Sequence, residues 1–208
     1  MVKDYSGNVF VNCPFDEEYL PILNAIIFAI FDCGFIPRSA LEEDDGGITR
    51  FDKIKHLISI SKFGIHDISR TELDEGTDLP RFNMPLELGV FVGAKRFGNT
   101  HQAKKNTLIL DKEQYRYQMF MSDIAGQDIR SHENEPAQVI SIIRNWLNSA
   151  SDGITIQGGA AINERYERFL VALPEICGEV QLVVEEVTYV DYYNLASGWL
   201  RTRANVSL

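Results

Sequence analysis

The residue of this sequence best suited to do chemistry is Glu87. It stands in the run NMPLELG at positions 83–89, where Pro85 and the following apolar residues predict the start of a helix. Its apolar neighbours should bury the carboxylate and raise its pKa. A carboxylate in a dry cleft can hydrogen-bond a ribose diol, or attack or stabilise an oxocarbenium-like carbon. The alternative is a capping role, in which Met84 is the N-cap and Glu87 occupies N3.

Further polar residues stand where neighbouring strands should end. The predicted strands are 9–14, 35–41 and 63–69, and the helix after the third strand carries Glu87. Ligands of open parallel sheets bind beyond the carboxyl ends of the strands, at a topological switch point. We therefore expect one cleft around Glu87, lined by Asn12, Pro14, Phe15, Arg38, Ser39, Arg50, Asp67 and Asn83.

Three of these residues have an ordinary structural alternative. Arg38 could clamp a phosphate or carboxylate, or it could pair with Glu42 or Asp44. Asp67 could position a ligand or cap the turn that follows its strand. Arg50 follows two glycines at a predicted helix start, and could face the cleft or the solvent.

The remaining patterns exclude several kinds of site. His66 lies inside a predicted strand and is expected to be a core residue whose hydrogen bonds are satisfied, whereas His56, His101 and His132 are scattered and form no metal set with the acids. No G-x-G-x-x-G sequence and no P-loop occurs, so hydride transfer and kinase chemistry have no support. We expect no metal and no bound cofactor.

The elements that must position the cleft alternate along the chain. Predicted helices at 17–33, 49–61, 84–95, 115–121 and 136–150 separate the three strands from a fourth at 107–111 and from a short edge strand near 128–129. No hairpin signal is present. This alternation predicts right-handed crossovers and an α/β, flavodoxin-like three-layer fold with a parallel sheet of four or five strands.

The last quarter of the chain does not continue the alternation of strands and helices. Residues 151–159 are typical of a linker, a helix is predicted at 161–173 with Pro174 as its end, and 180–199 is apolar and aromatic. These residues are too few for a core of their own. We predict an α/β domain at 1–150 and a C-terminal helical extension at 151–208, packed on that domain or on a second subunit.

Composition limits the partners. The chain has 208 residues and a net charge of −10, so it lacks the clustered cations of a nucleic-acid-binding surface. Three cysteines fit no metal or disulfide pattern and are expected to be small buried residues of a reducing compartment. The start of the sequence resembles no signal peptide and no apolar run reaches membrane-spanning length, which predicts a cytoplasmic protein with no membrane contact.

Several short motifs resemble known enzymes. The run at 83–89 is similar to the Asn-Val-x-x-Glu-Leu-Gly motif of bacterial TIR-like nucleotide-cleaving domains, and to the Glu-x-Gly helix of nucleoside 2-deoxyribosyltransferases. The run NCPF at 12–15 resembles the Gly-Pro strand end of the transferases, with Cys13 in place of glycine, and HDI at 66–68 resembles their Ala-Asp-Leu. The resemblance covers roughly residues 8–150.

The resemblance implies cleavage of an N-glycosidic bond, with NAD or a related nucleotide as the substrate. Glu87 would be the catalytic carboxylate, Asp67 would position the sugar and Arg38 would hold a phosphate. Two alternatives stay open: a nucleoside 2-deoxyribosyltransferase-like enzyme, and a non-catalytic TIR-like module for nucleotide sensing or assembly. A homo-oligomer is expected in each case.

Overall fold

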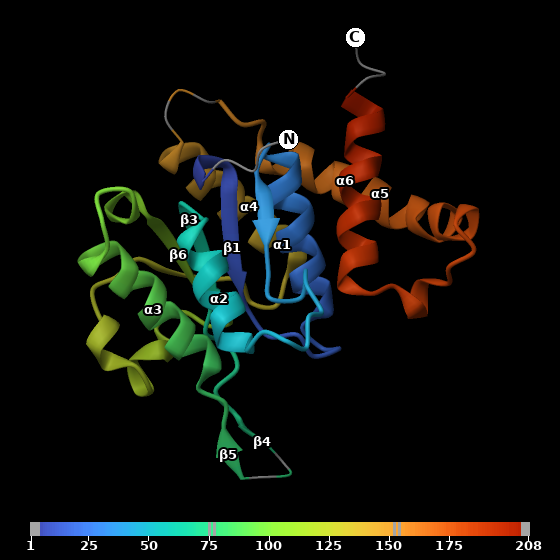
Figure 1. Cartoon of the computed structure of the whole chain (residues 1–208). Coiled ribbons are helices and arrows are strands. Elements are labelled where there is room, and N and C mark those ends of the chain that lie inside the picture. The colour runs from blue at the N-terminus through green and yellow to red at the C-terminus, as the bar shows by residue number, and fades with distance from the viewer. Residues whose placement is uncertain (1–4, 75, 77, 152, 154, 205–208) are drawn as a thin grey trace.

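Five parallel strands form the central sheet of the computed structural model (Figure 1), which describes residues 5–74, 76, 78–151, 153 and 155–204. Their order is β2-β1-β3-β6-β7. The strands are β1 (Asn8–Asn12), β2 (Ile36–Arg38), β3 (Phe63–Asp67), β6 (Asn106–Asp111) and β7 (Ile129–Ser131). With helices on both faces, this is the predicted flavodoxin-like fold, and its topological switch point lies between β1 and β3.

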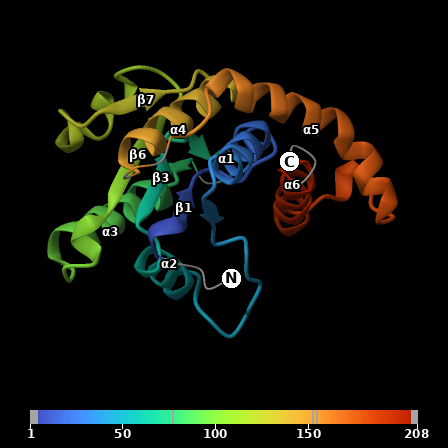
Figure 2. The same ribbon diagram turned by 90° about the horizontal axis from the view of Figure 1, so that it is seen from above.

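Helices cover both faces of the sheet (Figure 2). One layer contains α1 (Leu20–Asp32) and α4 (Pro136–Ala150), and the other contains α2 (Arg50–Ser59) and α3 (Asn83–Phe97). Because side chains alternate along a strand, Val9 and Val11 of β1 pack in the first layer, whereas Phe10 packs in the second. The nearly all-apolar α1 is buried as predicted, and Gly34 follows it at φ +86°.

The C-terminal helices α5 (Gly159–Glu179) and α6 (Tyr189–Ala204) extend the core on the outer side of α1 (Figure 2). The ring of Phe28 in α1 lies 5.4 Å from that of Phe169 and 6.1 Å from that of Trp199, measured between centroids. Arg165 of α5 also forms an ion pair of 2.6 Å with Asp32. This segment therefore packs on the α/β part of its own chain.

One predicted helix end is wrong. Pro174 does not terminate α5, which continues to Glu179 with the proline inside it. Proline removes one hydrogen-bond donor and crowds the preceding turn, but it does not forbid a helix whose packing continues past it. Leu173 and Cys177, on either side of Pro174, are both buried in the core, and this packing outweighs the local penalty.

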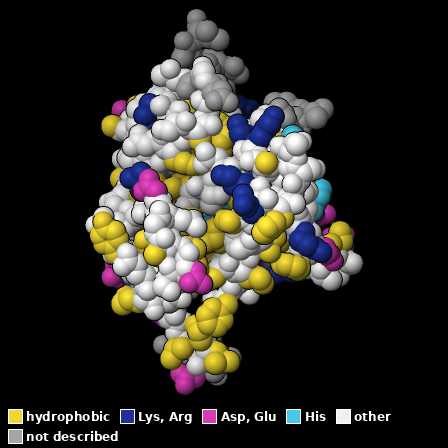
Figure 3. Space-filling model, turned by 90° about the vertical axis from the view of Figure 1, so that its left-hand side faces the viewer, with side chains coloured by type: hydrophobic (Ala, Val, Ile, Leu, Met, Phe, Trp, Pro, Cys, Tyr) yellow, Lys and Arg dark blue, Asp and Glu magenta, His cyan; other side chains and the backbone are white. Residues whose placement is uncertain are grey.

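The prediction of no hairpin is also wrong. Two-residue strands β4 (Leu73–Asp74) and β5 (Leu79–Pro80) pair antiparallel in the loop before α3. Strands of this length are too short to leave an alternating pattern in the sequence. The hairpin protrudes from the body (Figure 1), and hydrophobic side chains gather on it (Figure 3).

The remaining described elements are short. Residues 115–121, predicted as a helix, contain a 3-10 helix, and the predicted linker joins α4 to α5, with its residues 152 and 154 outside the described part of the chain. The 3-10 helices are η1 (Tyr5–Gly7), η2 (Gln102–Lys104), η3 (Arg116–Met119), η4 (Ser122–Ile124) and η5 (Val184–Glu186). The three cysteines are all buried, as predicted. None of the described helices is both long enough and apolar enough to span a membrane.

Candidate functional site

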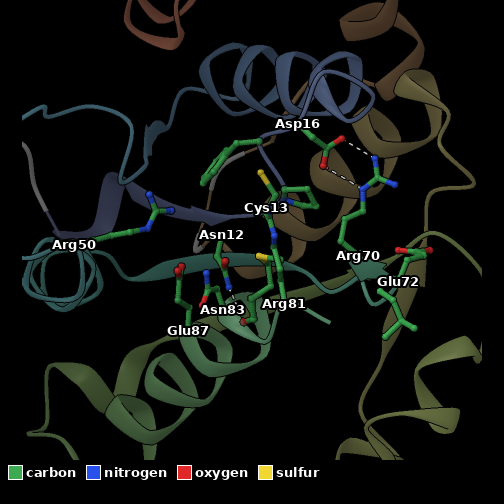
Figure 4. A pocket seen from close by; sticks show the side chains of 13 residues that line it. Asn12, Cys13, Asp16, Arg50, Arg70, Glu72, Arg81, Asn83 and Glu87 are labelled. Atoms are coloured by element: carbon green, nitrogen blue, oxygen red, sulfur yellow. Dashed lines mark hydrogen bonds and ion pairs between the residues drawn. The ribbon is translucent and has the colours of Figure 1, made fainter. Parts of the chain in front are cut away.

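A cleft of about 700 Å³ opens beyond the carboxyl ends of β1 and β3, at the switch point of the sheet (Figure 4). Its walls come from the loop after β1, the start of α2, the loop after β3 and the start of α3. The lining residues are Asn12, Cys13, Pro14, Phe15, Asp16, Arg50, Arg70, Glu72, Leu73, Arg81, Asn83, Met84 and Glu87. The cleft thus unites Glu87 with five of the predicted lining residues: Asn12, Pro14, Phe15, Arg50 and Asn83.

Glu87 lies on the wall of this cleft with only 6% of its surface exposed. Burial raises the pKa of its carboxyl to about 7, although the positive charge of Arg50 acts in the opposite direction. Within the described part of the chain, no hydrogen bond or ion pair holds this carboxylate. The carboxyl therefore changes between its neutral and ionised forms near neutral pH, and its oxygens are available to a ligand.

The capping role considered for Glu87 is excluded by the start of α3. The helix begins at Asn83 with Phe82 as its N-cap, and the Leu86 N–H donates to the Phe82 carbonyl at 3.0 Å. Glu87 therefore lies in the second turn, too far along to bond back to the N-cap. A buried carboxylate at this position contributes nothing to the helix end, which leaves its role to the cleft.

Arg50 supplies a cation at the cleft. It is the first residue of α2, whose N-cap Thr49 accepts a hydrogen bond of 3.1 Å from the Asp52 N–H. Its guanidinium carbon lies 5.7 Å from the centre of the Phe15 ring, a cation–π distance. In the described part of the chain Arg50 forms no ion pair, so its charge is available to an anionic group.

Asn12 joins three elements at the floor of the cleft. Its side-chain nitrogen donates to the Met84 carbonyl at 2.9 Å and lies 3.0 Å from His66 Nδ1. It therefore connects the end of β1 to β3 and to the first turn of α3. His66 is buried as predicted, with no exposed surface, but the prediction that its hydrogen bonds are satisfied is wrong, because its Nε2 has no partner among the described residues.

Sequence reasoning missed the other end of the cleft. Arg70 and Glu72 line it, but both are engaged: Arg70 contacts Asp16 at 2.6 Å and Glu18 at 2.7 Å, and Glu72 pairs with Lys112. The one signal in the sequence was their position just after a strand that ends at the switch point. Because Arg70 and Glu72 are each paired with another protein side chain, they form a wall of the cleft and not a charged binding subsite.

Arg38 and Ser39 do not line this cleft. Arg38 Nε donates to both carboxylate oxygens of Glu42 at 2.9 Å, which is the structural alternative named above. The backbone N–H of Ser39 donates to the same carboxylate at 2.6 Å. Both residues border a separate pocket of about 260 Å³ beside α2, at the end of the edge strand β2.

Asp67 also lies outside the cleft lining. It is fully buried, with its oxygens 2.7 Å from the Tyr19 hydroxyl, 2.8 Å from the Ser69 N–H and 2.9 Å from His132 Nε2. The Asn134 N–H donates to His132 Nδ1, so the proton of a neutral His132 lies on Nε2. These contacts make Asp67 an internal anchor of the strand ends.

The described residues contain no group of three His, Cys, Asp or Glu side chains placed to hold a metal ion. Comparisons with protein-family models, with curated proteins and with solved structures find no match to this chain. The case for a function therefore rests on the cleft itself and on the short motifs that line it.

Proposed function

We propose that this protein cleaves the N-glycosidic bond of a ribose-containing nucleotide, with NAD as the first substrate to test. The observation that supports this proposal best is Glu87, a buried carboxylate with a pKa near 7 in a cleft at the switch point of the sheet. The motif resemblance of residues 83–89 to nucleotide-cleaving TIR-like domains supports the same reaction.

In this mechanism the bond between C1′ of the ribose and the base breaks, and its electron pair leaves with the base. The ionised Glu87 carboxylate stabilises the positive charge that develops at C1′ and on the ring oxygen. Water then adds to C1′ and loses a proton, which yields the free sugar hydroxyl. A cationic base such as nicotinamide leaves as a neutral molecule, so no acid is required at the leaving group.

The contacts of the cleft residues change the roles that we assign to them in binding phosphate and sugar. Arg50 replaces Arg38 as the residue that holds a phosphate, because Arg38 is neutralised by Glu42. Asn12 and Asn83 replace Asp67 as the partners of the sugar, because they line the cleft and Asp67 does not. The cleft volume of about 700 Å³ lies within the range of small-molecule sites and suits a nucleotide.

Base release followed by chromatography tests the proposal. Wild type and Glu87→Gln are incubated with NAD, NADP, nucleosides and deoxynucleosides, each at low and at high protein concentration because we expect a homo-oligomer. Release by wild type that is lost in the variant supports the proposal. Exchange of bases between deoxynucleosides would instead indicate a deoxyribosyltransferase, and no release at any concentration would favour a nucleotide-sensing module.

A further inference from the structure

His66 is buried behind the wall of the cleft, where a ligand does not reach it. Its side chain has no exposed surface, and Asn12, which contacts it, lines the cleft. Among the described residues its Nε2 finds no hydrogen-bond partner. A buried histidine with an unsatisfied nitrogen calls for an explanation, because such groups are rare in folded proteins.

The hydrogen bonds of Asn12 determine where the proton of His66 lies. A carbonyl can only accept, so the Asn12 side chain must turn its nitrogen toward the oxygen of Met84. The same nitrogen faces His66 Nδ1, which must therefore accept, and the proton of the neutral ring lies on Nε2. Burial and the charge of Lys105 lower the pKa of His66 to about 3, so the ring remains neutral at physiological pH.

The same imidazole contacts α3 at a second point. The rings of His66 and Phe91 meet edge to face, with centroids 4.9 Å apart. Gly64 makes this contact possible, because a Cβ atom there would lie 2.6 Å from the Phe91 ring and 2.9 Å from His66 Nε2. The Lys105 ammonium also contacts Phe91, and its nitrogen lies 4.2 Å from the centre of the Phe91 ring.

These two contacts flank Glu87 along the helix. Met84 and Phe91 are seven residues apart, about two helical turns, and Glu87 lies between them. Residues at spacings of three, four and seven share one face of a helix. The helix face that carries Glu87 is therefore anchored on both sides, by Asn12 at Met84 and by His66 at Phe91.

We infer that His66 is a positioning residue, which acts through Asn12 and Phe91 to hold the Glu87-bearing face of α3 against β1 and β3. Because both amide hydrogens of Asn12 are directed to protein partners, its oxygen is the polar atom left to meet a ligand at the cleft. The consequence for catalysis rests on the proposed function, whereas the positioning itself can be measured without any substrate.

The experiment compares His66→Leu with His66→Asn. Leucine provides no acceptor, whereas the asparagine oxygen can take the place of imidazole Nδ1. Carboxyl NMR of the full chain measures the pKa of Glu87, and base release measures kcat and KM. H66L should move that pKa from about 7 toward its ordinary 4.5 and lower kcat about 100-fold with little change in KM. H66N should restore both in large part.

Leu108→Ala is the matched control for general damage to the core. Leu108 is buried on β6 and belongs to the core cluster on the opposite face of the sheet, with α1 and α4. Its truncation should lower the midpoint of thermal unfolding, because it leaves a cavity in the core. The pKa of Glu87 should nevertheless stay at its wild-type value.

Three results would overturn the inference. They are an unchanged Glu87 pKa in H66L, an equal loss in H66N and H66L, and imidazole nitrogen NMR of wild type that finds the proton on Nδ1. The last measurement requires no variant, so it decides the matter even if H66L does not fold. A wild type without base release, but with the expected NMR results, would overturn the proposed function and retain the positioning role.

Discussion

Glu87 should reduce the stability of the protein at neutral and alkaline pH, and its replacement by glutamine should relieve this cost. Burial raises the pKa of the folded-state carboxyl from its ordinary 4.5 to about 7. The folded chain therefore binds more protons than the unfolded chain between these values. The contribution of Glu87 to stability is therefore most favourable below pH 4.5 and is lost as the pH rises through about 7.

The size of this effect follows from the pKa difference. At about 1.4 kcal/mol for each pKa unit, a rise from 4.5 to about 7 corresponds to about 3 kcal/mol. Glutamine resembles the neutral form of the carboxyl at every pH. Glu87→Gln should therefore unfold with almost the wild-type free energy near pH 4.5, and should be more stable than wild type by up to about 3 kcal/mol near pH 8.

Urea denaturation of both proteins at the two pH values measures this difference. Glu72→Gln is the matched control, because Glu72 borders the same cleft but pairs with Lys112, and its pKa is lowered rather than raised. This control should gain no stability at the higher pH. An equal stability of wild type and Glu87→Gln near pH 8 would refute the view that the folded protein holds Glu87 in a desolvated site.

Three further substitutions test other parts of the structure. Arg38→Ala should cost about 2 kcal/mol in urea denaturation, because it strands the partly buried Glu42 carboxylate, and it should leave the affinity for nucleotides unchanged in calorimetry. Arg50→Leu should shift the pH midpoint of base release upward, since Arg50 lowers the pKa of Glu87; an unchanged midpoint would contradict their coupling. Phe169→Ala should cost about 3–5 kcal/mol in thermal unfolding, and a negligible cost would show that α5 does not share the core.

The fold could be predicted from the sequence because its central strands are short apolar runs bounded by polar residues, whereas its helices carry apolar residues at helical spacing. The run at 63–67 and the apolar helix at 20–32 have patterns strong enough to assign, and the alternation of elements determined the parallel sheet. The β4–β5 hairpin could not be predicted, because two-residue strands carry no periodicity. The helix across Pro174 was missed because distant packing, which the local pattern does not contain, maintains it.

The site was predictable where position along a strand decides the outcome. Asn12 and Glu87 follow from the rule that ligands meet the carboxyl ends of parallel strands at a switch point. Arg38 and Asp67 satisfy the same rule but turn to protein partners, and the partner of Asp67 at His132 is remote in sequence. Whether a side chain points into the cleft or toward a protein partner depends on such contacts, which a single sequence does not reveal.

The rate of base release from NAD tests most directly whether Glu87 cleaves an N-glycosidic bond. Wild type, Glu87→Gln and Glu164→Gln, an exposed control on α5, are compared across a pH series. We predict that wild type and the control release nicotinamide with a pH midpoint near 7, and that Glu87→Gln loses at least about 100-fold in kcat. Release by Glu87→Gln at the wild-type rate would contradict the claim.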